Sequence, residues 1–377
     1  MITVATVTRA LRSLPTLLLA AACGDVGEPS PYEWRIPEHF PQPLVPGGSA
    51  PSEARVELGR HLFYEERLST TGDVSCASCH RPELAFSDDR ATSVGADGHP
   101  GIRNAPSLAN VAYQPSLTWG NPLLITLEAH ALVPLFVDHP LELGAQHVID
   151  HELDRMAHDE YRARFAAAFP DEDDPFTIVS VTIALASFQR TLVSGDSAYD
   201  RFLRGDDDAL GESASRGLAL FESPRLGCAR CHEGLLLGSP MRSTDDPDVR
   251  PRFAITGLVS IDANGVLAAD PGLYEFTHDP RDLGRHRVPS LRNVALTAPY
   301  MHDGSIEDLE GVIAHYAAGG RATLDQPGEP LVPAPDPLVT GFELSDVERA
   351  DLIAFLEALT DESFLSEPRL SDPDPIP

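Results

Sequence analysis

Two copies of one five-residue pattern, Cys-x-x-Cys-His, constrain this 377-residue chain more than any other feature of its sequence. The copies are Cys76-Ala77-Ser78-Cys79-His80 and Cys228-Ala229-Arg230-Cys231-His232. In this pattern the two thiols form thioether bonds to the vinyl groups of a haem, and the adjacent histidine binds the iron from one side. The sequence therefore predicts two covalently bound c-type haems, with His80 and His232 as proximal ligands.

Two other uses of paired cysteines fit the pattern less well. A structural zinc site would take all four cysteines together, whereas here each pair is followed directly by its own histidine and the pairs lie far apart in the chain. A thioredoxin-like redox pair would call for one motif inside a βαβ unit, and the sequence has no such pattern. Haem attachment is the favoured interpretation.

The composition excludes several classes of protein. A chain of this length with 42% hydrophobic residues can bury at least one full core. The 34 prolines and 28 glycines follow no period, which indicates a loop-rich globular protein. The formal charge is −30, from 28 basic and 58 acidic residues. A nucleic-acid partner is therefore not expected, because phosphate binding needs clustered Lys and Arg.

The N-terminus has the layout of a bacterial export signal. Arg9 and Arg12 precede an apolar run that ends at Ala20-Ala21-Ala22-Cys23, a sequence similar to a lipobox. Residues 1–22 are therefore predicted to be a signal peptide, and a lipid on Cys23 would be the chain's only contact with a membrane. The alternative is cleavage by an ordinary signal peptidase, which would leave Cys23 as a free thiol. Both routes predict a periplasmic protein.

A weak internal repeat predicts two domains. Gly59-x-x-Leu62-Phe63 precedes the first Cys-x-x-Cys-His unit, and Gly217-x-x-Leu220-Phe221 precedes the second. The halves are therefore interpreted as two cytochrome c-like domains, each with one covalently bound haem c. The predicted segments are a Pro-rich linker at 23–50, an N-terminal domain at 51–204, a C-terminal domain at 205–365 and a tail at 366–377.

Apolar periodicity predicts a mainly α fold with long ordered loops and little β structure. Apolar residues from Ile178 to Leu192 recur every three or four positions, as on one buried face of a helix. A second helix is predicted to begin at Ser305, in a capping box with Asp308, and to place Tyr316 on its buried face. A third is predicted from Ser345 to Leu359.

The group on the far side of each iron decides between an electron carrier and an enzyme. An iron with six ligands passes electrons, whereas an iron with an open position can bind peroxide. In the second half, Met301 is the first choice of sixth ligand by composition. Tyr316 competes with it, because it lies on the inward face of the following helix. The residue types alone leave both candidates open.

Further motifs resemble those of the bacterial di-haem cytochrome c peroxidases and their MauG relatives, in the same order along the chain. They are Leu58-Gly59-Arg60, Arg67-Leu68-Ser69, Arg103-Asn104-Ala105-Pro106-Ser107-Leu108, Val288-Pro289-Ser290-Leu291-Arg292-Asn293-Val294 and the stretch from Thr297 to Gly304. Three other stretches are most similar to MauG-like enzymes of the MbnH type, which act on a partner protein. These are Leu117-Thr118-Trp119-Gly120-Asn121-Pro122, Pro140-Leu141-Glu142-Leu143-Gly144 and His315-Tyr316-Ala317-Ala318-Gly319-Gly320.

The resemblance implies roles for individual residues. Tyr316 matches the position that is methionine in the peroxidases and tyrosine in MauG-like enzymes, so it becomes the expected iron ligand in place of Met301. Glu142 matches the acidic residue above the first, peroxide-binding haem, where it would move protons. His130 stands where the family usually has glutamine, and would either assist proton transfer or bind the iron. Trp119 corresponds to the tryptophan between the haems.

The resemblance also implies a calcium ion and an open first haem. Asn104, Thr297 and Pro299 match the family's calcium ligands, one side-chain oxygen and two backbone carbonyls. The peroxidases carry a removable distal histidine before the Arg-Asn motif. His99 lies near that position but out of register, so the first haem is expected to be open without prior reduction.

Together these features predict an exported di-haem c oxidoreductase. The resemblance implies that it uses hydrogen peroxide to form a high-valent state of the two haem irons, which oxidises a protein partner. Two alternatives stand beside this function. A cytochrome c peroxidase would reduce hydrogen peroxide with electrons from a small cytochrome, and a non-enzymatic di-haem protein would only transfer electrons.

Overall fold

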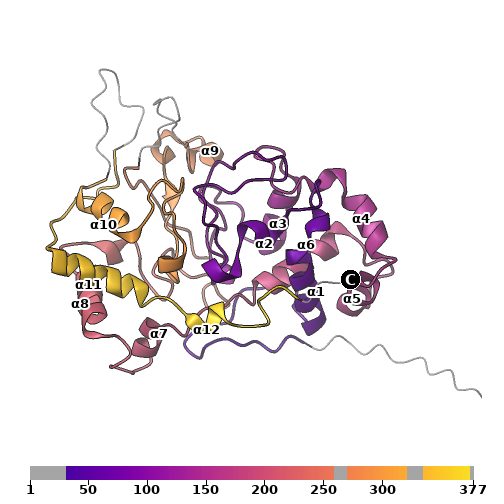
Figure 1. Ribbon diagram of the computed structural model, residues 1–377, viewed down its shortest axis with the longest axis horizontal. Helices are drawn as coiled ribbons and strands as arrows, with labels where there is room; N and C mark the ends of the chain where they lie inside the picture. Colours follow the sequence, from indigo (N-terminus) through magenta and orange to yellow (C-terminus); the bar gives the residue numbers. More distant parts are fainter. Residues whose placement is uncertain (1–30, 259–269, 321–333, 374–377) are drawn as a thin grey trace, which may run out of the picture.

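The computed structural model describes residues 31–258, 270–320 and 334–373. Within them the chain is mainly helical, as predicted, and its longer helices form two groups at opposite ends of the molecule (Figure 1). The helices are α1 (Glu53–Tyr64), α2 (Cys76–Cys79), α3 (Leu127–Phe136), α4 (Ile149–Met156), α5 (Tyr161–Ala168), α6 (Ile178–Gln189), α7 (Ala198–Leu203), α8 (Glu212–Glu222), α9 (Tyr274–Thr277), α10 (Leu309–Ala317), α11 (Asp346–Glu357) and α12 (Glu362–Leu365).

Regular β structure in the described part of the chain is limited to one small ladder. β1 (Phe253–Ala254) pairs antiparallel with β2 (His286–Arg287), and Phe253 lies opposite Arg287. Long loops connect the remaining elements, so the expectation of a mainly α fold with little β is confirmed. None of the helices in the described ranges is long and apolar enough to cross a bilayer.

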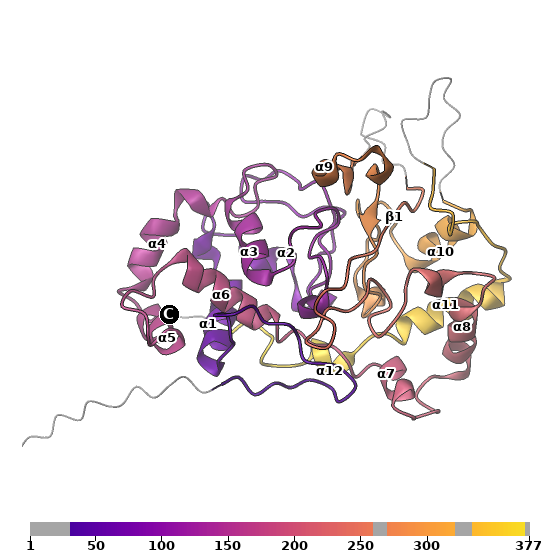
Figure 2. The ribbon, with the colours of Figure 1, turned by 180° about the vertical axis from the view of Figure 1, so that it is seen from behind.

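Two separate apolar cores divide the molecule. The first is built mainly from side chains between Leu58 and Leu192, and the second from side chains between Tyr199 and Leu359. Figure 2 shows the same division from behind, with α1 and α6 at one end and α8 and α11 at the other. The chain then returns to the first core, because Phe364 and Leu370 are buried there.

Each core contains the same helix crossing. A Cβ atom added to Gly59 of α1 would lie 1.9 Å from the backbone oxygen of Ala184 in α6. A Cβ atom added to Gly217 of α8 would lie 1.9 Å from the backbone oxygen of Asp351 in α11. Glycine therefore allows both backbones to approach more closely than any side chain would permit. The repeat seen in the sequence is a repeat of this packing.

An aromatic pair accompanies each crossing. One turn after the first glycine, Phe63 packs on Phe188 with 5.3 Å between ring centroids. One turn after the second glycine, Phe221 packs on Phe355 with 5.2 Å between centroids. These rings are buried and lie at distances typical of favourable aromatic contacts. The two helix pairs thus share backbone spacing and core chemistry.

The segment before α1 packs against the body rather than standing apart from it. Phe40 is buried and its ring lies 5.7 Å from that of Tyr113. The Tyr113 hydroxyl donates a hydrogen bond of 2.9 Å to the Pro41 carbonyl. Residues 31–50, predicted as part of a linker, therefore lie along both halves. The predicted signal peptide 1–22 and Cys23 lie outside the described residues.

One predicted helix start is wrong. The capping box at Ser305 is not formed, since α10 begins at Leu309 and its N-cap is Asp308, whose side chain accepts from the Gly311 amide at 2.7 Å. Asp308 was expected inside the helix, but a short carboxylate competes well for the first free amides. The third predicted helix does have the expected cap, because Ser345 and Glu348 form a capping box at the start of α11.

Candidate active site

The first Cys-x-x-Cys-His unit forms a single helical turn that aims its histidine. The His80 amide donates to the Cys76 carbonyl at 2.9 Å, which closes the turn. The Nδ1 atom of His80 lies 2.9 Å from the Phe86 carbonyl. Because a carbonyl can only accept, Nδ1 carries the proton and Nε2 keeps its lone pair. Burial lowers the pKa of His80, so the ring is neutral, as an iron ligand must be.

The second unit repeats this arrangement in a 3-10 turn at Cys228–Arg230. The His232 amide donates to the Cys228 carbonyl at 3.0 Å, and Nδ1 of His232 lies 3.1 Å from the Leu237 carbonyl. Burial lowers the pKa of His232 to about 4. Both histidines therefore present a neutral Nε2 atom, held in direction by a backbone carbonyl.

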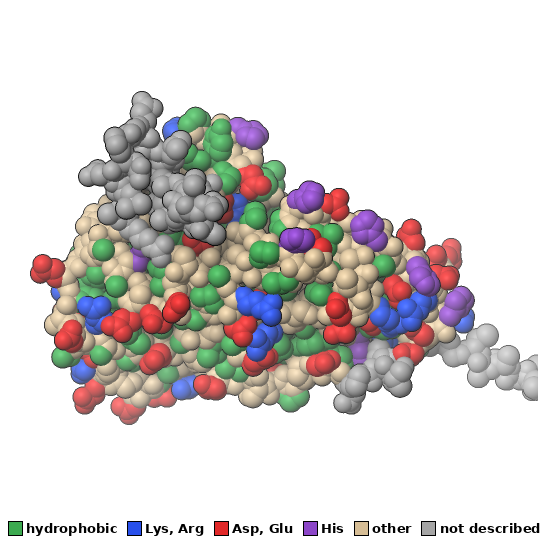
Figure 3. All heavy atoms as spheres, turned by 45° about the horizontal axis from the view of Figure 1, so that its top comes forward, with side chains coloured by type: hydrophobic (Ala, Val, Ile, Leu, Met, Phe, Trp, Pro, Cys, Tyr) green, Lys and Arg blue, Asp and Glu red, His purple; other side chains and the backbone are tan. Residues whose placement is uncertain are grey.

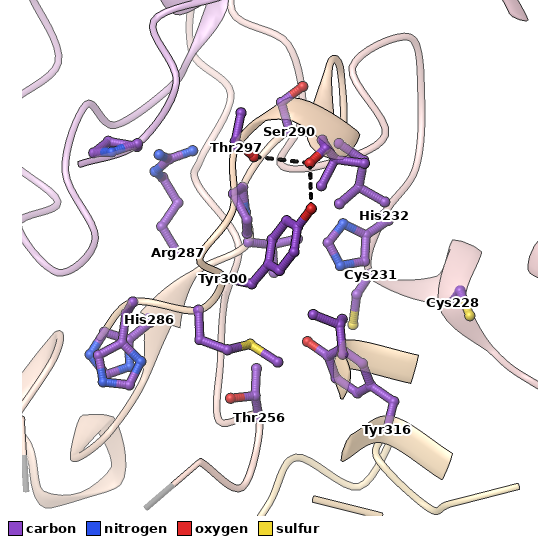
Figure 4. A pocket seen from close by; sticks show the side chains of 18 of the residues that line it. Cys228, Cys231, His232, Thr256, His286, Arg287, Ser290, Thr297, Tyr300 and Tyr316 are labelled. Carbon is purple, nitrogen blue, oxygen red and sulfur yellow. Dashed lines mark hydrogen bonds between the residues drawn. The ribbon is translucent and has the colours of Figure 1, made fainter. Parts of the chain in front are cut away.

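A cavity of about 250 Å³ adjoins the second unit and fits a haem by the chemistry of its walls. Cys228, Cys231, His232 and Tyr316 all line it, together with apolar side chains (Figure 4). All four cysteines of the two units are free thiols, available for thioether bonds. Two thiols, a neutral imidazole and a phenol around one apolar space are the groups that an attached haem with a tyrosine ligand requires.

Tyr316 faces this cavity from α10. Ile313 and Leu309, one and two turns earlier, line the same cavity, so the predicted inward face of the helix is correct. Burial raises the pKa of Tyr316. Its side chain is half-buried, and the phenol borders the cavity. Met301 lines the same cavity, so the structure brings both candidate ligands to it.

Glu142 lies near the first pair of cysteines. Its backbone oxygen accepts a hydrogen bond of 2.7 Å from the Ala96 amide, which holds the loop against the 94–101 segment. The side chain is exposed at the surface of the protein. The surrounding protein nevertheless desolvates the carboxyl group and raises its pKa. Burial raises the pKa of the Cys76 thiol to about 12, and the charge of Glu142 adds to that rise. Glu142 is thus a carboxyl group that holds its proton more readily than usual, close to the first attachment unit.

His130 lies on α3, in the same region. Thr126 caps this helix, and its side chain accepts from the Ala129 amide. Burial, together with the proximity of His80 and Arg287, lowers the pKa of His130 to about 4. His130 is therefore neutral at pH 7 and lies near His80. It can relay a proton or offer a lone pair, and its role stays a prediction.

Trp119 is held rigidly in the wall of the cavity. Its ring is 9% exposed, and its indole Nε1 donates a hydrogen bond of 2.8 Å to the Asn104 carbonyl. The Asn104 amide group donates to the Arg90 and Ala91 carbonyls at 3.1 and 3.3 Å, which leaves its side-chain oxygen unengaged by these bonds. Thr297 and Pro299 line the same cavity as Asn104. The calcium assignment of these three residues stays a prediction.

His99 lies at the surface, away from these sites. Its side chain is 80% exposed, and its ring nitrogen lies 3.2 Å from an Asp97 carboxylate oxygen. Since the side chain projects into solvent, His99 is not positioned as a ligand in this structure. This placement agrees with its being out of register with the distal histidine of the peroxidases.

The structure also assembles a cluster that the sequence did not reveal. The rings of His286 and His302 stack with 3.6 Å between centroids, and Nε2 of His286 lies 3.3 Å from an Asp270 oxygen. Arg103, from the first half, binds both oxygens of Asp270 at 2.7 and 2.8 Å. This ion pair joins the halves beside the cavity. No local motif signals it, because its members are far apart in sequence.

Comparison with known proteins identifies the family. A family model described as di-haem cytochrome c peroxidase matches residues 53–208. The methylamine utilization protein MauG of Methylorubrum extorquens is 36% identical over 87% of this chain and 84% of its own length. The chain belongs to the di-haem cytochrome c peroxidase and MauG family. It is an oxidoreductase, and the family implies two haem c cofactors.

Members of both branches of this family are similar to the chain. Cytochrome c551 peroxidase of Pseudomonas aeruginosa is 30% identical over 86% of this chain and 83% of its own length. A solved structure of a MauG-like protein associated with microbial copper homeostasis superimposes with a TM-score of 0.85. It is 42% identical and covers 91% of this chain and 99% of its own. These relatives imply hydrogen peroxide as oxidant and a protein as electron donor or substrate.

Proposed function

We propose that this di-haem enzyme uses hydrogen peroxide to oxidise a protein partner, as MauG-like enzymes do. The observation that carries the proposal is Tyr316, whose phenol lines the same cavity as His232. A phenolate favours an oxidised metal more strongly than the methionine thioether of the peroxidases would. Tyr316 therefore supports an oxidising second site rather than one that only passes electrons.

Glu142 and His130 handle protons at the first site. When bound, the haems supply the redox chemistry that peroxide cleavage requires. The Glu142 carboxylate would take a proton from hydrogen peroxide and return it to the leaving oxygen, as a general base and then a general acid. Its raised pKa makes Glu142 a stronger base, which favours the first of these two transfers. His130, neutral and half-buried nearby, adds no positive charge to this region.

Trp119 connects the two sites. It is buried, hydrogen-bonded to Asn104 and part of the wall of the second cavity. An indole is easily oxidised, so Trp119 would relay oxidising equivalents between the two sites. The Asn104 carbonyl that holds the indole cannot take its proton. The ring therefore stays in position throughout a relay.

A calcium ion and export complete the proposal. Asn104, Thr297 and Pro299 would hold the calcium, which suits oxygen donors. The chain would act in the periplasm, anchored through Cys23 if that residue carries a lipid. Acidic side chains are spread over the face drawn in Figure 3 without gathering in one patch. Together with the formal charge of −30, this favours a basic protein partner.

A cytochrome c peroxidase is the second candidate function. The relative from Pseudomonas aeruginosa, 30% identical over 86% of this chain, favours it. The two candidates differ in what consumes the oxidising equivalents. A peroxidase turns over rapidly with a reduced small cytochrome, whereas a MauG-like enzyme modifies a partner protein. A purely electron-carrying role is not supported, because the relatives are enzymes.

The sixth ligand of the second haem iron is tested with the variant Tyr316→Phe. Met301→Leu is the matched control, because Met301 lines the same cavity. In ferric holoprotein, Tyr316→Phe should abolish the low-spin electron paramagnetic resonance signal of the second haem, and Met301→Leu should leave it unchanged. The reverse pattern would assign the iron to Met301 and favour the peroxidase.

The reaction is tested with two electron sources. Peroxide is added to the holoprotein with a reduced small c-type cytochrome, or with purified products of neighbouring genes. The proposal expects slow cytochrome oxidation and a peroxide-dependent mass change in one of those proteins. Rapid cytochrome turnover without any mass change would overturn it.

A further inference from the structure

Arg287 is a buried cation without a buried anion. It is 5% exposed, and burial lowers its pKa to about 10. Its Nη1 donates to the Gln114 side-chain oxygen at 2.9 Å, and its Nε to the Thr118 carbonyl at 3.1 Å. Both partners are neutral. Among the described residues, no carboxylate forms an ion pair with Arg287, so this charge is uncompensated.

The other buried arginines of the described chain are neutralised. Arg292, five residues further on and 2% exposed, lies 2.6 Å from an Asp200 carboxylate oxygen. Arg190, 1% exposed, lies 2.8 Å from a Glu128 oxygen. A buried ion without its partner is costly, by several kcal/mol in typical proteins. Arg287 therefore departs from a rule that this chain otherwise obeys, which points to an anion supplied from outside the chain.

The acidic cluster at Asp270 is already engaged. Asp270 binds Arg103 through both oxygens, at 2.7 and 2.8 Å, and lies 3.3 Å from His286. Glu275 binds the same Arg103 guanidinium at 2.9 Å. These carboxylates are thus paired within the cluster and leave Arg287 without one.

The position of Arg287 identifies the class of anion. Arg287 lines the cavity that contains the second attachment unit, and Figure 4 shows it across that cavity from Cys228 and Cys231. In a haem, the vinyl groups that form thioethers and the carboxyl-bearing propionates occupy opposite edges of the ring. Thioether bonds at the cysteines therefore direct the carboxylates toward the Arg287 side.

We infer that Arg287 binds a propionate carboxylate of the second haem. This inference rests on the assignment of that haem to the His232 cavity in the proposed function. The guanidinium donates to the carboxylate in a charge-assisted hydrogen bond, which neutralises both groups away from water. The Arg287 guanidinium also lies 5.9 Å from the centre of the Trp119 ring. The pair therefore orients the carboxylate edge of the haem toward Trp119, so Arg287 is a positioning residue.

The test compares Arg287→Gln with Arg242→Gln in fully matured holoprotein. Arg242 is the matched control, because its guanidinium bonds only to backbone carbonyls and its loss removes the same charge. Resonance Raman spectra report the bending band of hydrogen-bonded propionates, and a redox titration reports the potential of the second haem. Arg287→Gln should shift the band and lower the potential, Arg287→Lys should restore the potential in part, and Arg242→Gln should change neither.

Two results would overturn the inference. The first is an unchanged propionate band in a fully haem-loaded Arg287→Gln protein. The second is a potential that depends on chloride only when Arg287 is present, which would assign the site to a solution anion. If Arg287→Gln does not accumulate, the wild-type band is compared in H2O and D2O, and a band without an isotope shift contradicts the bond. None of these readouts depends on Tyr316 or on the partner, so this inference and the proposed function can fail separately.

Discussion

The two halves of the molecule share one scaffold, but different side chains surround its two attachment units. In each half a glycine lets one helix cross another at backbone contact. Gly59 of α1 packs against α6, and Gly217 of α8 packs against α11. Each half then presents a Cys-x-x-Cys-His turn whose histidine is aimed by a backbone carbonyl, at Phe86 or at Leu237. The repeated part of the fold therefore accounts for haem attachment and for the proximal ligand.

The halves differ in the groups that accompany the attachment unit. Near the first unit, α3 and the loop after it bring His130 and Glu142, both able to carry protons. At the second unit, α10 brings Tyr316, which can bind a metal. This difference indicates that the repeated scaffold alone does not specify the function of each half. In the proposed function, the segments packed around it decide which half handles protons and which holds a sixth ligand.

Removing the thiols of one half should have the largest effect, because it removes one of the two haems. Cys76→Ser with Cys79→Ser should lower the haem content from two to one per chain and abolish peroxide turnover, because the peroxide-binding haem is lost. Cys228→Ser with Cys231→Ser should also leave one haem, but that haem should still bind cyanide. The pyridine haemochrome assay and cyanide titration measure both. Equal cyanide binding by the two variants would contradict distinct roles for the halves.

Glu142→Gln should have the next largest effect. Loss of a general acid and base typically slows a reaction by about 10²–10⁴-fold. Since desolvation raises the pKa of Glu142 above 4.5, wild-type activity should fall as the pH drops through that raised value and the base becomes protonated. The variant should lack this acidic limb. The initial rate of peroxide consumption between pH 4 and 8 measures it.

Asp150→Asn is the matched control for Glu142→Gln. Asp150 is exposed on α4, in the same half of the chain, and its substitution removes one carboxylate as well. Its rate and pH profile should equal those of the wild type. A control that slows as much as Glu142→Gln would assign the effect to surface charge instead of proton transfer.

Alanine substitutions at the two crossing glycines test whether the two helix crossings are equivalent. Gly59→Ala and Gly217→Ala should each lower the free energy of unfolding by about 1–3 kcal/mol, as overpacking does. The similar 1.9 Å approaches predict similar losses. Gly47→Ala, where no atom lies within 4 Å of the added Cβ, is the control. Denaturant titration measures all three, and markedly unequal losses would show that the two crossings are not equivalent.

The smallest effect should come from the start of α10. Asp308→Ala removes the side chain that accepts from the Gly311 amide, and such N-caps contribute about 1 kcal/mol. Ser345→Ala at the start of α11 removes a comparable cap from the helix that does not carry Tyr316. Both variants should lose similar stability in thermal unfolding. Only Asp308→Ala should also broaden the spectrum of the second haem, and a spectrum unchanged in both would argue against the link between cap and ligand.

Local patterns were sufficient for part of this description. The Cys-x-x-Cys-His units, the glycine repeat and the apolar face of α10 are short-range features, and the structure places each of them on a helix or a helical turn. The start of α10 was predicted wrongly, because Ser305 and Asp308 are both good caps and only the path of the preceding loop selects between them.

The sequence alone was sufficient to predict two haem c cofactors and the protein family, because thioether attachment needs only residues that are adjacent in the chain. Tertiary structure alone decided what surrounds those groups. It left Arg287 without a buried carboxylate, paired Arg103 with Asp270 across the two halves and brought Glu142 near the first thiols. The physical reason is distance, since burial and charge act between residues that only folding brings together.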